Sequence, residues 1–99
     1  PWEIYKVTKK FPKEELFGLT SQMRRSVYSI PTNIAEGCGR NSNAQLVNFL
    51  QIATGSCSEI QYQLMLSKEL LCITEELFSE LHKEAVEIRK MIFKYSEKL

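Results

Sequence analysis

The sequence predicts an all-α protein, an antiparallel up-down-up-down four-helix bundle formed as a single domain over residues 1–99, with a first helix that is short or truncated. Apolar residues recur at alternating steps of three and four positions, which is the spacing of helices that pack along one another. Turn signals are few, and with only four glycines and three prolines they divide the chain into four segments. We expect helices over about residues 1–11, 20–38, 43–71 and 75–98, packed at about 20° to one another.

The first segment, residues 2–11, carries its apolar residues on one side and ends before Pro12. A helix of ten residues spans about 15 Å, roughly a third of the length expected for the third helix. A long helix that is left uncovered exposes apolar surface. We therefore expect either that residues upstream of Pro1 complete the first helix or that a partner chain covers the gap.

The second segment contains Pro31 inside its apolar pattern. Proline lacks an N–H group and its ring collides with the preceding turn, so we expect the helix to bend or break locally there. Gly39 follows the segment and is suited to a left-handed residue at the helix C-terminus. Glu36 lies four residues before Arg40, so the two side chains can pair across one turn.

A dense polar motif occupies the end of this segment and has two interpretations. One is a kinked helix with a structural polar cluster, and the other is a recognition or assembly surface. The motif residues are Ser29, Pro31, Asn33, Glu36, Gly37 and Gly39. Residues 40–42 then lead into the third helix, whose N-terminus could hold an anion, although no Walker pattern is present.

The third and fourth segments have clear start signals. Ser42 is followed three residues later by Gln45, a capping-box pattern, and Thr74 is an N-cap candidate before two glutamates. Gly55 lies inside the third helix, where we expect a close approach of two helices to compensate for its low helix propensity. Further apolar residues widen the third helix's apolar face and indicate a second neighbour: Phe49, Ile52, Leu66 and Leu70. The seam of the fourth helix is Phe78, Leu81, Ala85, Ile88, Ile92, Tyr95 and Leu99.

Composition argues against an enzyme. All 12 acidic residues are Glu and there is one His, so a Ser-His-Asp triad and an EF-hand cannot be built. Cys38, Cys57 and Cys72 form no CxxC pair, and we expect them to be small buried hydrophobes in a reducing cytoplasm. We expect no metal, no cofactor, no small-molecule substrate and no membrane segment. Nucleophilic chemistry at Cys38 would need His82, which lies far away in the sequence.

Charge is distributed unevenly along the chain. Residues 1–55 carry seven basic and four acidic groups, and residues 56–99 carry six basic and eight acidic groups. The first part can therefore present a modest phosphate-facing patch, for which an ordinary solvated surface is the alternative. The candidate nucleic-acid-binding residues are Lys9, Lys10, Lys13, Arg24, Arg25 and Arg40. Aromatic residues in the same half, such as Tyr5 and Tyr28, could stack on unpaired bases or fill the core.

Four stretches resemble one bacterial family. They read LTSQMRR at residues 19–25, SIPTNIAEGCGR at 29–40, FLQIATGSCSEI at 49–60 and YKVTKKFP at 5–12. The chain is similar to the four-helix bundle proteins encoded in intervening sequences of 23S ribosomal RNA genes. The resemblance implies a homo-oligomeric ring, typically a pentamer, with no established enzymatic activity and a first helix that starts earlier than Pro1.

Two functions follow from the residues and the resemblance together. The first is a non-enzymatic homo-oligomer, a pentameric ring that associates weakly with RNA or the ribosome through the candidate basic residues. The alternative is a nucleic-acid-binding accessory protein of the reverse-transcriptase type, because the related accessory proteins of diversity-generating retroelements form similar rings that bind nucleic acid.

Overall fold

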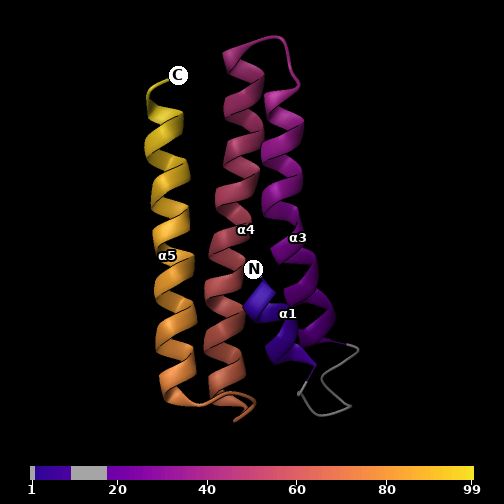
Figure 1. Cartoon of the computed structure of the whole chain (residues 1–99), viewed down its shortest axis with the longest axis vertical. Coiled ribbons are helices and arrows are strands. Elements are labelled where there is room, and N and C mark those ends of the chain that lie inside the picture. Colours follow the sequence, from indigo (N-terminus) through magenta and orange to yellow (C-terminus); the bar gives the residue numbers. More distant parts are fainter. Residues whose placement is uncertain (1, 10–17) are drawn as a thin grey trace.

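The computed structural model describes residues 2–9 and 18–99 and places them in four helices (Figure 1). The long helices α3, α4 and α5 run antiparallel to their neighbours in chain order, and the short α1 lies against α3 (Figure 1). Helix α4 is central, since both α3 and α5 pack on it. The all-α prediction with a short first helix is confirmed. The helices are α1 Trp2–Thr8, α3 Leu19–Cys38, α4 Asn43–Glu69 and α5 Glu75–Glu97.

Two helices end earlier than expected. Helix α1 ends at Thr8 within the described residues, and the expected continuation to Phe11 lies outside them. Helix α4 ends at Glu69, two residues short of the expected end, because Leu71 adopts a left-handed conformation with φ of 60°. The Cys72 amide then donates to the Ser67 carbonyl at 2.9 Å, which closes the helix end.

The caps at the helix starts agree with the sequence patterns. The Ser42 hydroxyl accepts a hydrogen bond from the Gln45 amide at 3.2 Å, and the Thr74 hydroxyl accepts one from the Leu77 amide at 3.1 Å. Each cap satisfies one of the amide groups that a helix N-terminus leaves without a partner. Both N-cap predictions are confirmed.

The sequence predicts a bend or a local break at Pro31, and α3 continues through this residue without a break. Proline removes one hydrogen bond, and the side chains around it supply others. The Asn33 side-chain amide donates to the Ser29 carbonyl at 2.8 Å and to the Ser29 hydroxyl at 2.9 Å. Gly39 is right-handed with φ of −84°, so the expected left-handed cap was wrong; its amide bonds to the Ala35 and Glu36 carbonyls.

The close helix approach lies at Gly37, and the expectation that it lies at Gly55 was wrong. A Cβ atom on Gly37 would lie 2.8 Å from Leu46 Cδ1 and 2.9 Å from Phe49 Cβ. A Cβ atom on Gly55 would have no neighbour within 4 Å, because Gly55 faces outward on α4. The short turn between α3 and α4 brings these two helix ends together, and Gly37 lies at that point.

The core lies along the two sides of α4. In α5 the seam residues Leu81, Ala85 and Ile92 are buried, whereas Tyr95 and Leu99 are exposed because no described residue covers the upper end of α5. The buried hydrophobic residues are Ile4, Leu19, Met23, Val27, Ile30, Leu50, Ala53, Cys57, Ile60, Leu64, Ile73, Leu81, Ala85 and Ile92.

The two helical glycines test this packing. Gly37→Ala should lower the free energy of unfolding by about 1–3 kcal/mol, because its methyl group collides with Leu46 and Phe49. The matched control Gly55→Ala should raise it by up to about 1 kcal/mol, because alanine is the better helix former and meets open space. Urea denaturation followed by circular dichroism measures both changes, and equal effects at the two sites would contradict the assignment.

Candidate functional site

The contact between α1 and α3 is built around Arg24. Its Nε atom donates a hydrogen bond to the Thr8 hydroxyl at 3.0 Å, and Thr8 is fully buried. Its guanidinium carbon lies 4.3 Å from the centroid of the Tyr5 ring, within the range of a cation–π contact. The Thr8 hydroxyl donates in turn to the Tyr5 carbonyl at 3.0 Å. The guanidinium plane of Arg24 is therefore held in one orientation by two residues of α1.

Lys9 adds a second positive charge to this contact. Its Nζ atom lies 5.2 Å from the centroid of the same Tyr5 ring, and its side chain is exposed. Tyr5 also meets Tyr28 of α3 edge to face, with ring centroids 6.4 Å apart. Among the described residues, neither Lys9 nor Arg24 forms an ion pair with a carboxylate. The combination of two cations and aromatic rings is suited to a phosphate-bearing chain.

Arg25 and Arg40 lie elsewhere. Arg25 is exposed and lines a polar cavity of about 310 Å³ between α3 and α4, together with Ser29, Ser56 and Glu59. Arg40 follows the far end of α3, about 24 Å along the helix from Arg24 at 1.5 Å per residue. It pairs with Glu36 at 3.2 Å, as predicted, and lies 4.8 Å from the Phe49 ring centroid. Lys10 and Lys13 lie outside the described residues.

The polar motif of α3 divides between two surfaces. Ser29 accepts a hydrogen bond from the Ser56 hydroxyl of α4 at 2.7 Å, and Gly37 is buried against α4. Pro31, Glu36 and Gly39 are exposed. Ser29, Asn33 and Gly37 make contacts within the chain, as the structural interpretation expects. The exposed residues are accessible to a partner, as the recognition interpretation expects.

Further polar residues line the same α3–α4 seam. The Gln63 amide donates to the Ser26 hydroxyl at 3.3 Å, and the Ser67 hydroxyl lies 3.4 Å from the Met23 sulfur. Gln63 Oε1 is buried and has no hydrogen-bond partner within the described part of the chain. These contacts and the role of Thr8 could not be predicted from the sequence, because a polar residue on an apolar helix face does not reveal which helix it meets.

The cysteines differ in burial, so the expectation that all three are buried was wrong. Cys57 is fully buried, Cys72 is half-buried, and Cys38 is exposed at the last position of α3. Burial raises the pKa of the Cys57 thiol, and the Arg89 charge lowers it by a smaller amount. His82 lies in the first half of α5, whereas Cys38 is the last residue of α3.

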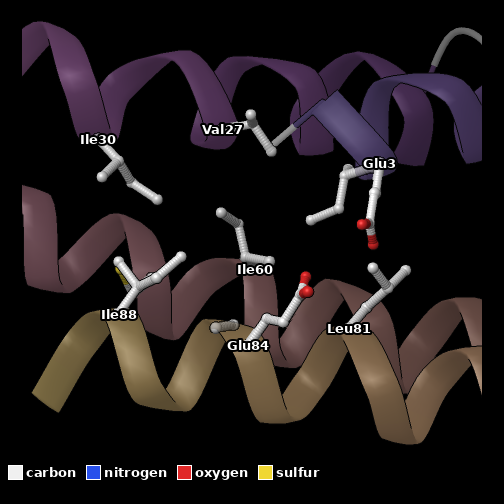
Figure 2. Close-up of a pocket in the computed structure, with 10 residues that line it drawn as sticks. Glu3, Val27, Ile30, Ile60, Leu81, Glu84 and Ile88 are labelled. Atoms are coloured by element: carbon white, nitrogen blue, oxygen red, sulfur yellow. The ribbon is translucent and has the colours of Figure 1, made fainter.

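A small pocket lies beside α1. Its volume is about 20 Å³, enough for roughly one water molecule, and its wall is mostly apolar (Figure 2). Glu3 and Glu84 are at its edge, where their carboxylates approach one another (Figure 2). Together with Glu80 they form an exposed group whose carboxylate oxygens lie within 4.8 Å of one another. All three glutamates are exposed, and exposed acidic groups of this kind are common without a bound metal ion.

A model of the 23S rRNA-intervening sequence protein family matches residues 2–94. The chain belongs to this family. A crystal structure of a protein of unknown function from the S23 ribosomal protein family of Bacteroides thetaiotaomicron is similar to it, with 29% sequence identity and a TM-score of 0.87. The match covers 96% of this chain and 86% of that chain. A comparison with curated proteins found no match.

Membership of the 23S rRNA-intervening sequence family confirms the resemblance seen in the four sequence stretches. Those stretches include the Arg24–Arg25 pair and the motif from Ser29 to Arg40, so the contacts described above lie within the family's matched region. Within the described residues, no helix is both long and apolar enough to cross a membrane.

Thiol labelling tests the burial of the cysteines. Cys38 should react with an alkylating reagent within minutes at pH 8, and Cys57 should react only on unfolding.

The raised pKa of Cys57 has a second consequence: as the pH rises above about 8.5, the unfolded thiol ionises before the folded one, so the free energy of unfolding should fall. Mass spectrometry of the labelled peptides checks the first result, and Cys57→Ala should remove its share of the alkaline loss.

Proposed function

We propose that this member of the 23S rRNA-intervening sequence family is a non-enzymatic, self-assembling helical module, a homo-oligomer for which the family resemblance implies a pentameric ring. The observation that carries the proposal is the outer face of α4. There Ile52 is 51% exposed and Tyr62 is 66% exposed, although α4 is the central helix of the chain.

The outer face of α4 has the composition of a contact surface. Ile52, Gly55, Glu59 and Tyr62 follow one another along this face, and the missing side chain of Gly55 leaves a notch beside Ile52. Phe49 and Leu66 are half-buried, and Leu66 packs on the chain's own core. Of the four predicted flank residues, Ile52 and Leu70 are therefore left over for a neighbour, since Leu70 is 48% exposed. A cyclic ring needs such a patch to meet a different surface of the next copy.

Charge placed on the α4 face should break the assembly. The double substitution Ile52→Glu with Tyr62→Glu should convert the oligomer into a monomer, because it buries two carboxylates without partners at the contact. Ser21→Glu is the matched control, since it adds the same side chain at an exposed position of α3. Light scattering coupled to size-exclusion chromatography gives the mass. A wild-type chain that is monomeric at micromolar concentration would refute the proposal.

A weak association with RNA is the second candidate function, and the Arg24 contact favours it. The guanidinium of Arg24 keeps its terminal nitrogens available after Nε binds Thr8, and Lys9 brings a second charge to the same ring. In a ring, several copies could contact one RNA molecule at the same time, and avidity would raise the overall affinity above that of a single site. The same surface would serve a nucleic-acid-binding accessory protein of the retroelement type.

Charge reversal tests this surface. Arg24→Glu with Arg25→Glu should weaken binding of labelled single-stranded RNA by about tenfold or more at low salt, because two phosphate contacts are lost. The loss of these contacts should also lower the salt dependence of the binding constant. Arg25→Glu alone keeps the contact with α1 intact and should retain part of the affinity. Arg40→Glu is the control at the far end of α3. Fluorescence anisotropy at two salt concentrations measures the change, and a loss in Arg40→Glu equal to that of the double variant would contradict the assignment.

A further inference from the structure

The outer face of α5 carries its charges in two blocks. Glu76 and Glu80 lie in the N-terminal half of the helix, Lys94 and Lys98 lie at its C-terminal end, and all four are exposed. Glu87 lies midway between them: Glu80 and Lys94 are each seven residues away, and Glu76 and Lys98 are each eleven residues away. Each glutamate of the first block is therefore as far from Glu87 along the chain as one lysine of the second block.

These residues share one stripe of the helix. With about 3.6 residues per turn, the stripe lies on the side opposite the buried Leu81, Ala85 and Ile92. Met91 falls within the stripe and is 66% exposed, and Lys83 occupies its mirror position about Glu87. The steps between successive members are four, three, four, four, three and four, which is the spacing of a helix-packing seam. The stripe consists of Glu76, Glu80, Lys83, Glu87, Met91, Lys94 and Lys98.

Nothing within the described part of the chain neutralises these charges. The ion pairs found there join Arg40 to Glu36 and Lys68 to Glu75, and neither involves the stripe. Helix α5 is the edge helix of the three long helices, so its outer side faces away from α4 (Figure 1). The acidic block is strengthened by Glu3 of α1, whose carboxylate lies within 4.8 Å of that of Glu80.

We propose that a second copy of this chain docks on the outer face of α5 in antiparallel orientation, with a two-fold axis at Glu87. This arrangement places Glu80 opposite Lys94 of the second copy and Glu76 opposite Lys98, each pair occurring twice. The aliphatic stem of Lys83 covers Met91 across the contact. The axis sets Glu87 against its own copy, which is one repulsive pair against four attractive ones. A parallel arrangement would set glutamate against glutamate and lysine against lysine throughout, so charge selects the antiparallel one.

This contact goes beyond the proposed assembly through α4 and uses a different surface. A two-fold contact joins identical patches, whereas a ring contact joins unlike ones, so one chain can make both. The attraction consists of exposed ion pairs and therefore weakens as the salt concentration rises.

Disulfide trapping locates the axis. In a Cys38→Ser background, Glu87→Cys should form a covalent dimer under mild oxidation, because the two copies of position 87 face one another. Lys98→Cys is the matched control on the same stripe: in the antiparallel contact its two copies are about 33 Å apart and should not join. Comparable yields at positions 87 and 98, or no dimer at position 87, would overturn the proposal.

Charge exchange tests the pairing in the Glu87→Cys background. Lys94→Glu and Glu80→Lys should each lower the yield of the covalent homodimer by about tenfold, because each creates two repulsive pairs. A mixture of the two variants should recover a heterodimer, in which every pair is again of opposite charge. No recovery in the mixture would refute the contact. The readout is local to α5, so a failed ring through α4 changes the mass of the particle and leaves this result intact.

Discussion

The packing of α3 and α5 against the two sides of α4 is the constraint on which the rest of the structure depends. Polar residues of α4 meet both neighbours: the buried Ser56 and Gln63 bond to α3, whereas the half-buried Gln61 accepts a hydrogen bond from Arg89 of α5 at 2.9 Å. Because both sides of the central helix are used for packing within the chain, the outer residues of the three long helices remain exposed. The α4 patch, the α5 stripe and the exposed half of the α3 motif all follow from this arrangement.

The short α1 depends on that arrangement in a different way. An isolated helix of seven residues is not stable in water, so α1 exists because α3 holds it. The holding contacts are Ile4 in the core and the link from Arg24 to Thr8 and Tyr5. The same arginine that binds α1 also supplies the candidate phosphate contact. A substitution at Arg24 therefore changes both the contact with α1 and the candidate phosphate contact. A substitution at Arg25 keeps the contact with α1, so the RNA affinities of the two variants have to be compared.

The fold could be predicted from the sequence because its signals are local. Caps such as Ser42 and Thr74 act within three residues, and the seam of α5 needs only its own spacing to identify Leu81 and Ala85 as buried. Gly55 and Gly37 show where such reasoning stops. Both are glycines in a helix, and only the partner helix decides that Gly37 is crowded and Gly55 is free. The candidate site had the same limit: Arg24 and Arg25 were identified, but the contact of Arg24 with Thr8 joins residues 16 positions apart.

The turn between α4 and α5 shows how weakly that part of the chain is determined. Leu71 is 90% exposed and holds a left-handed conformation, two properties that are each unfavourable for leucine. Leu71 is exposed, and its neighbours close the turn: the Leu71 and Cys72 amides bond to the Lys68 and Ser67 carbonyls, and Lys68 pairs with Glu75 at 4.0 Å. Loops of this kind accept inserted residues more readily than the helices they connect. The position of Leu71, between the end of α4 and the buried Ile73, is therefore one at which this scaffold can be lengthened, or given a tag or a new binding loop.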